Sequence, residues 1–223
     1  MRINQEFITP IISATAVIIG SIIGATCTWI TTNHSTIKTI EVENKIVEEN
    51  RKNEELEKLL KFCENINIIR LDICNSLFQS IRTLKDFHEG NFGNRYPISI
   101  NRDYSRVVAS LTGKFDLKEL SYIYQVYGII ETLNKHISEL GFNDKNGYEL
   151  IKMDCELLLK KFYGENYKKI IELDIDKICY EELYNNEFMK KGYRHILKKL
   201  DMHSYSEKSK EKEIKEKYIQ SRG

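Results

Sequence analysis

The longest feature of the hydrophobic pattern is an uncharged run that extends from Phe7 through Ile37. Within it, the stretch from Ile11 to Ile30 consists mainly of isoleucine, valine, alanine and glycine. About 20 apolar residues in a helix, each rising ~1.5 Å, are enough to cross the ~30 Å hydrocarbon layer of a bilayer. The pattern therefore predicts a transmembrane helix over residues 9–32 with the lipid bilayer as its partner, preceded by a short flank at residues 1–8.

The ends of this span carry further signals. Thr9 followed by Pro10 favours a helix start, because proline in a first turn lacks only a donor that has no partner there. Trp29 lies where an interfacial aromatic residue is expected. A cleaved signal peptide is the alternative, but its apolar core is shorter and the sequence offers no well-placed small-x-small cleavage site. Cys27 is a poor lipoprotein acceptor, because Thr26 precedes it.

Four small residues recur at every fourth position of the span: Ala16, Gly20, Gly24 and Thr28. They share one face of the helix, so that two backbones can approach closely and cross with a right-handed geometry. The pattern predicts a homodimer through the transmembrane helix. The alternative is that it reflects the ordinary composition of membrane helices, in which small residues are frequent.

Charged residues are dense from Ile37 to Glu55, within the stalk predicted over residues 33–55, and no clean heptad survives there. This composition favours a solvated helical stalk over a tight coiled coil. Basic residues follow the span more densely than they precede it, where Arg2 stands alone; those that follow are Lys38, Lys45, Arg51 and Lys52. Because positive residues favour the cytoplasmic side, we expect a single-pass protein of the cell membrane whose C-terminal domain is cytoplasmic.

Helical periodicity then continues through residues 56–203. Apolar residues recur every three or four positions from Leu56 to Leu84, which predicts one long amphipathic helix that ends near Gly90. Asp116 is placed to cap a second strongly periodic run, from Leu120 to Ile137. The sequence therefore predicts an all-α fold: one N-terminal transmembrane helix, a charged helical stalk and a bundle-like helical domain.

Shorter segments complete this domain. A helix capped by Asn101 or Asp103 is expected through Leu111, and another over residues 148–163 with Leu150, Met153, Leu157 and Leu158 on its buried face. Further short helices are expected at residues 167–173, 177–184 and 187–200. The tail at residues 204–223 alternates lysine with glutamate and is expected to be disordered.

Composition and charge exclude several classes of function. The net charge is +1 and basic residues are interleaved with acidic ones, whereas nucleic-acid readers concentrate a basic excess, so nucleic acid is an unlikely partner.

Five cysteines are too sparse for a disulfide scaffold and favour reduced thiols. The histidines lack metal-site spacing and no phosphate-binding glycine motif occurs, so no catalytic, cofactor-binding or metal site is predicted. A Cys155 nucleophile with His136 as its base remains open beside the simpler interpretation of a buried thiol.

The least helical stretch, from Gly90 to Tyr104, is the most promising surface for recognition. Arginine and tyrosine are favoured at interfaces, and loops on a rigid frame often carry binding. A possible partner-binding loop therefore includes Arg95, Tyr96, Arg102, Tyr104 and, just beyond it, Arg106. The alternative is a connector whose arginines pair with nearby acids.

Two segments carry a resemblance to known proteins: IGSIIGATCTWITTN from Ile19 to Asn33 and FDLKELSYIYQVYGIIETL from Phe115 to Leu133. With these, the chain resembles a loose group of small bacterial and prophage-type proteins that have a single span and a C-terminal helical domain. The resemblance implies a topology and supplies no catalytic residue.

Three hypotheses from different classes follow. The leading one is a membrane-tethered interaction or regulatory module with an unknown protein partner; by resemblance, phage defence or stress response is a plausible setting. The second is a membrane-perturbing, holin-like or toxin-like protein, although the span has no polar stripe to line a pore. The third is an enzyme with an unrecognised helical site.

Overall fold

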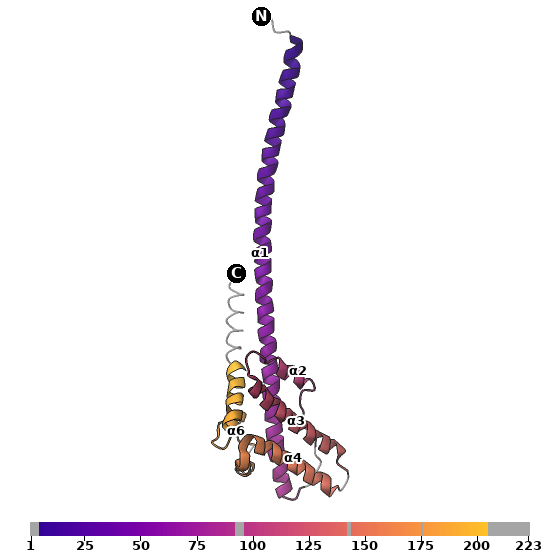
Figure 1. Cartoon of the computed structure of the whole chain (residues 1–223), viewed down its shortest axis with the longest axis vertical. Coiled ribbons are helices and arrows are strands. Elements are labelled where there is room, and N and C mark those ends of the chain that lie inside the picture. The colour runs from indigo at the N-terminus through magenta and orange to yellow at the C-terminus, as the bar shows by residue number, and fades with distance from the viewer. Residues whose placement is uncertain (1–4, 92–95, 142–143, 175, 205–223) are drawn as a thin grey trace. The chain divides into compact units, whose positions relative to one another are not determined.

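A computed structural model of the chain describes residues 5–91, 96–141, 144–174 and 176–204, with side chains from Pro10 onward. The regular secondary structure of these residues is entirely helical, without a strand, which confirms the predicted all-α class; the only β-type contact among them is an isolated bridge between Thr112 and Phe115. The elements are α1 (Gln5–His88), α2 (Tyr104–Ala109), α3 (Leu117–Glu139), α4 (Lys145–Tyr163), a 3-10 turn (Gly164–Asn166), α5 (Tyr167–Ile171), α6 (Tyr180–Asn185) and a last helix over residues 191–204 (Figure 1).

The chain divides into two compact units, residues 1–55 and 56–223. In the first, α1 is already helical at Gln5, so the predicted start at Thr9 and Pro10 is wrong. Pro10 lies inside the helix, where its missing N–H removes a single hydrogen bond near the helix end. The beginning of the predicted flank, residues 1–4, lies outside the described part of the chain.

The second unit is built around the apolar face of the last seven turns or so of α1. Ile66, Ile73, Leu77 and Ile81 are all buried there, as the three- and four-residue spacing predicts. α2, α3, α4 and α6 gather round this part of α1 (Figure 1). Their buried residues join it in one continuous hydrophobic core.

α3 begins where the sequence predicts. The Asp116 carboxylate accepts a hydrogen bond from the Glu119 N–H at 2.8 Å, and the Glu119 carboxylate accepts one from the Asp116 N–H at 2.8 Å. This reciprocal capping box fixes the start of the helix. The α2 cap differs from expectation: Asp103 makes no side-chain cap bond, and the Asn101 side chain accepts from the Asp103 N–H instead, in a local turn.

The predicted buried face of α4 is wrong for three of its four residues. Leu150, Met153 and Leu157 are exposed, while Ile151, Cys155, Leu158 and Phe162 are buried. Two apolar stripes run along this helix at helical spacing. The predicted stripe ends at Leu157, because Lys160 and Lys161 occupy the next positions on that face. The other continues to Phe162 and so removes more apolar area from water.

The start of α4 also differs, since the helix begins at Lys145, three residues earlier than expected. The Asp144 carboxylate makes this possible by accepting a hydrogen bond from the Gly147 N–H at 3.0 Å. Gly147, which the expected helix left out, is therefore part of α4.

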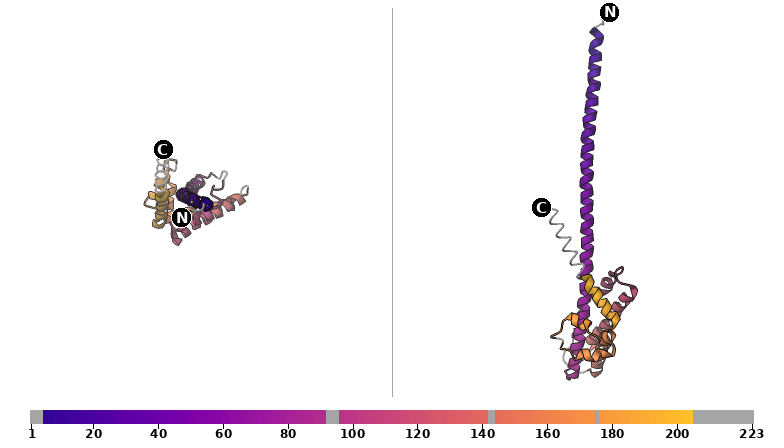
Figure 2. Two further views of the ribbon diagram at one scale, coloured as in Figure 1. Left: turned by 90° about the horizontal axis from the view of Figure 1, so that it is seen from above. Right: turned by 90° about the vertical axis from the view of Figure 1, so that its left-hand side faces the viewer.

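The last helix closes the second unit against α1 and α3 (Figure 2). Asp201 lies 2.5 Å from the Arg70 guanidinium of α1, and Lys199 lies 2.6 Å from Glu119 at the start of α3. Ser204, assigned above to a disordered tail, is helical and buried, and its hydroxyl donates to Asn67 of α1 at 2.9 Å. The rest of that tail, residues 205–223, lies outside the described residues.

The corrected face of α4 can be tested with neighbouring leucines. Replacing buried Leu158 by alanine should lower the free energy of unfolding by about 2–5 kcal/mol, because it removes buried carbon and leaves a cavity. Leu157, which is 50% exposed, should lose only about 0.5 kcal/mol with the same change. Urea unfolding of the full chain in detergent micelles, followed by near-ultraviolet circular dichroism, measures both. Equal losses would restore the original assignment.

A candidate partner-binding groove

A groove of about 370 Å³ lies between α1 and the loop that follows it. Its lining combines two aromatic residues, two residues of opposite charge and four neutral polar residues. These lining residues are Asn75, Phe78, Gln79, Arg82, Thr83, Asp86, Tyr96 and Ser99.

α1 supplies one wall of the groove as a regular helical stripe. Asn75, Gln79, Arg82 and Asp86 follow one another at steps of four, three and four residues, so they lie on one face of the helix. This polar stripe runs beside the apolar stripe that fills the core. The same turns of α1 therefore anchor the domain and present the groove.

The loop at residues 96–101 forms the other wall, and side chains hold its backbone in place. The Gln79 amide donates to the Tyr96 carbonyl at 2.5 Å. Asn134 of α3 accepts from the Ile98 N–H at 2.6 Å and donates to the Ile98 carbonyl at 2.9 Å. Ile98 is buried and lies outside any strand, so the Asn134 amide supplies the hydrogen bonds that its backbone N–H and carbonyl groups need. These bonds fix the groove wall before any partner binds.

A third support for the loop is the buried carboxylate of Asp72. One of its oxygens accepts from the Asn101 N–H at 3.1 Å and from the Tyr127 hydroxyl at 2.8 Å. Tyr104 stacks on the Tyr127 ring with centroids 4.2 Å apart. Burial raises the pKa of Asp72, and the two hydrogen bonds oppose that shift only in part.

The residues proposed for the partner-binding loop have separate locations. Tyr96 lines the groove and is 72% exposed, and Arg102 and Arg106 are also exposed. Tyr104 points inward onto Tyr127, which makes it part of the loop's support. Arg95 lies outside the described residues.

The α1 wall of the groove was not among the predicted binding residues. The polar stripe of Asn75, Gln79 and Arg82 was present in the sequence, but a solvated helix face has the same pattern. Arg82 pairs with Asp176 at 2.6 Å, and both side chains are largely exposed. Such a pair is easily broken, so Arg82 remains available to a partner.

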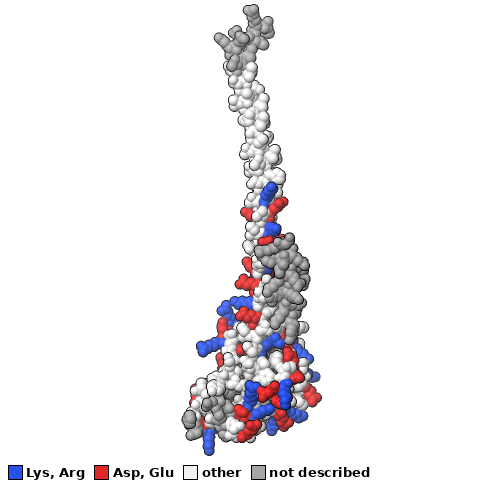
Figure 3. Space-filling model, turned by 180° about the vertical axis from the view of Figure 1, so that it is seen from behind, with Lys and Arg blue, Asp and Glu red and all other residues white. Residues whose placement is uncertain are grey.

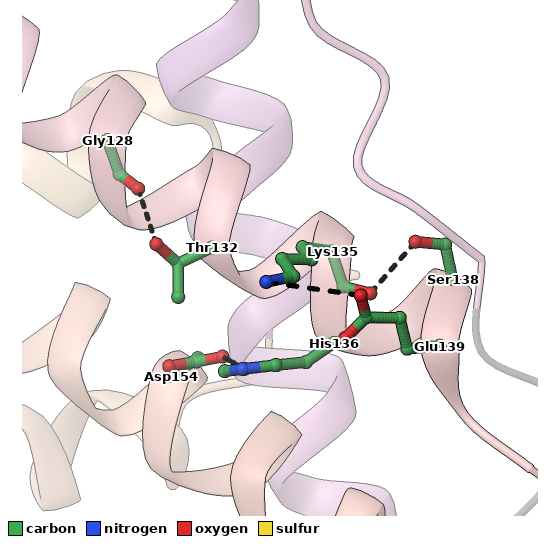
Figure 4. Close-up of polar contacts among 7 residues, drawn as sticks. All are labelled: Gly128, Thr132, Lys135, His136, Ser138, Glu139 and Asp154. Carbon is green, nitrogen blue, oxygen red and sulfur yellow. Dashed lines mark hydrogen bonds and ion pairs between the residues drawn. The ribbon is translucent and has the colours of Figure 1, made fainter.

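His136 has a carboxylate partner across the contact between α3 and α4. Its Nδ1 lies 2.5 Å from the Asp154 carboxylate, and neighbouring Lys135 pairs with Glu139 along α3 (Figure 4). Cys155 follows Asp154 and faces the core. In the described parts of the chain no three His, Cys, Asp or Glu residues gather closely enough to hold a metal ion.

The small-residue face of the first unit is exposed along its length. Apart from the adjoining backbone of the helix itself, no atom lies within 4 Å of the position that a Cβ would take at Gly20 or Gly24. The Thr28 hydroxyl donates to the Gly24 carbonyl at 2.8 Å, so its hydrogen-bonding capacity is met within the helix. The five cysteines form no disulfide.

Asp72 gives the domain a testable pH dependence. The pKa of Asp72 is raised in the folded state, whereas in the unfolded chain the carboxyl loses its proton near the ordinary value of 3.8. The contribution of Asp72 to the free energy of unfolding therefore falls as the pH rises above that value. Asp72→Asn keeps an oxygen for both hydrogen bonds and should flatten this fall when urea unfolding is measured from about pH 4 to pH 7. Asp72→Ala leaves two buried donors without an acceptor and should cost about 2–4 kcal/mol. An unchanged pH profile in Asp72→Asn would contradict the assignment.

Comparisons of the chain with protein-family models, with curated proteins and with solved structures give no match.

Proposed function

We propose that the chain is a membrane-tethered interaction module: α1 crosses the cell membrane once near its N-terminus, and the helical domain binds a protein partner in the cytoplasm through the groove. The domain packs as a helical bundle on the last part of α1. The observation that carries the proposal is the exposed apolar segment of α1.

By length and composition, α1 contains a stretch able to cross a membrane. The large apolar side chains of this stretch are more than half exposed, among them Ile11, Val17, Ile22 and Trp29. A core helix of a soluble domain hides such side chains against other elements, and that burial is worth about 25 cal/mol per Å². A bilayer gives this segment the apolar surroundings that the described chain does not.

Orientation in the membrane follows from the basic residues after the span. Lys38, Lys45, Arg51 and Lys52 are exposed on α1, consistent with contact with a cytoplasmic leaflet and its solvent. We infer that the helical domain lies in the cytoplasm, where the four cysteines that follow the span stay reduced.

The groove supports the interaction half of the proposal. Tyr96 and Phe78 offer aromatic surface, Arg82 offers a planar cation, and hydrogen bonds fix the loop wall in advance. Aromatic residues and arginine are enriched at the energetic centres of protein interfaces. On the face drawn in Figure 3, basic and acidic residues of the second unit are interleaved, an arrangement that favours a protein partner over nucleic acid.

Photo-crosslinking in intact cells tests tether and groove together. With benzoylphenylalanine at Tyr96, we expect one discrete crosslinked species that stays in the membrane fraction after carbonate washing. The same probe at Leu150, exposed on α4 outside the groove, should give none. A chain lacking residues 1–37 should leave the membrane fraction.

Three results would contradict the proposal. Equal crosslinking at Tyr96 and Leu150 would exclude the groove as the binding site. A mature protein whose mass shows cleavage within residues 9–32 would identify a signal peptide. Cell lysis that requires the span would favour the membrane-perturbing function.

We propose in addition that the span self-associates through Ala16, Gly20, Gly24 and Thr28. Gly24→Ile should weaken the dimer by about 1–2 kcal/mol, because the larger side chain separates the backbones. Within one chain a side chain at Gly24 meets no atom beyond the adjoining helix backbone, so the change causes no steric clash in the isolated helix. Ile22→Leu, on another face, should have little effect in a bacterial-membrane two-hybrid assay of the span. If Gly24→Ile associates as strongly as the parent, the face has no role in dimers.

A further inference from the structure

The loop wall of the groove contains an extended segment at residues 97–99. Both the N–H and the carbonyl of Ile98 bond to the side chain of Asn134, at 2.6 Å and 2.9 Å, so the two groups point to the same side of the chain. This is the backbone geometry of a residue paired in a β-ladder. Exposure also alternates as in a strand, because Pro97 and Ser99 are exposed while Ile98 is buried.

The other edge of this segment is open. Backbone groups of successive extended residues point to alternate sides, so the N–H and the carbonyl of Ser99 point away from Asn134. Within the described residues neither group has a hydrogen-bond partner, and Ser99 lines the groove. The Asn101 N–H, two residues further on, donates to Asp72 of α1 at 3.1 Å, so this edge faces α1. Pro97 has no N–H and suits an edge of this kind.

We propose that the groove binds an extended peptide segment of the partner, which adds to this edge as a strand and places an acidic side chain on Arg82. The inference rests on the groove as the binding site of the proposed function, and it specifies the form and charge of what binds there. Main-chain pairing with an exposed edge is a recurrent mode of peptide recognition. A helical partner uses its backbone hydrogen bonds internally and cannot pair with Ser99.

α1 forms the surface beneath the added strand. Asn75, Gln79 and Arg82 follow one face of α1 along the groove. Side chains of an extended peptide alternate between two faces, and residues paired across two strands share a face. The residue that pairs with Ser99 therefore points outward as Ser99 does, and the residues next to it in the peptide point onto α1. Recognition of particular side chains depends on those alternate positions.

Arg82 selects an acid at one of these positions. Its guanidinium lies 2.6 Å from the Asp176 carboxylate, so the site already receives a carboxylate from the chain itself. The two side chains are 61% and 74% exposed, and an ion pair in such surroundings contributes little to stability. A carboxylate of the peptide can therefore replace Asp176 on Arg82 at little cost, while Tyr96 and Phe78 supply apolar contact nearby.

Peptide selection on the full chain in maltoside micelles tests the inference, with a phage-displayed library of random linear peptides as the probe. We expect the enriched peptides to share an aspartate or glutamate, and Tyr96→Ala to abolish their binding, which assigns them to the groove. Fluorescence anisotropy of one labelled peptide then measures affinity. Arg82→Gln should weaken binding about tenfold, as the loss of a charge-assisted hydrogen bond implies. Lys198→Gln, which removes an exposed positive charge from the last helix, is the matched control and should bind as the parent does.

Two further measurements address the backbone pairing. Ser99→Pro removes the N–H and places a ring on the open edge, so it should bind about tenfold more weakly than Ser99→Ala, which keeps the N–H. Ile98 already has the extended backbone that a following proline requires. Without any change to the protein, N-methylation of the peptide at one residue after another should weaken binding at every second position, because only alternate N–H groups of an added strand face Ser99.

Equal affinities of Ser99→Pro and Ser99→Ala, with matching circular dichroism and melting temperature, would overturn the strand geometry, and so would an N-methylation profile without alternation. In both cases lost binding in Tyr96→Ala would still identify the groove as the binding site. Unchanged affinity in Arg82→Gln would overturn the acidic side chain. If no enriched peptide depends on Tyr96 while benzoylphenylalanine at Tyr96 still crosslinks a partner in cells, this inference fails alone. Failure of both experiments would contradict the proposed function as well.

Discussion

Burial of one apolar face of α1 is the constraint on which the helical domain depends. Ile66, Ile73, Leu77 and Ile81 belong to one hydrophobic cluster with buried residues of the other helices of the second unit, so α1 contributes a face to their common core. The same helix turns carry the polar stripe that lines the groove. Core and candidate binding surface are therefore two faces of one element, and they cannot shift independently.

Strong periodicity made the large features of the fold predictable. The face of α1 and the capping box of α3 follow from the sequence because each has one dominant physical solution. The α4 face was predicted wrongly because that helix carries two competing apolar stripes. Only the tertiary partner of Phe162 and Leu158 decides between them, and periodicity contains no such information.

The candidate groove was predictable in part. Tyr96 was predicted because interfaces favour tyrosine and loops on a rigid frame often carry binding. Gln79 and Asn134 were not predicted, because they act by hydrogen bonding to the backbone of a loop far along the chain. In the sequence, such an amide cannot be distinguished from an ordinary solvent-exposed amide on a helix.

Closure of the domain by its last helix has a consequence for synthesis. α1 leaves the ribosome early, but Arg70 and the apolar face beside it meet their final partners only when Asp201 and Ser204 have been made. At 5–20 residues per second, this interval is on the order of 10 s. During that time part of the apolar face of α1 is exposed on the nascent chain. Chaperones, or transient contacts with α3 and α4, must cover this surface until the last helix is made.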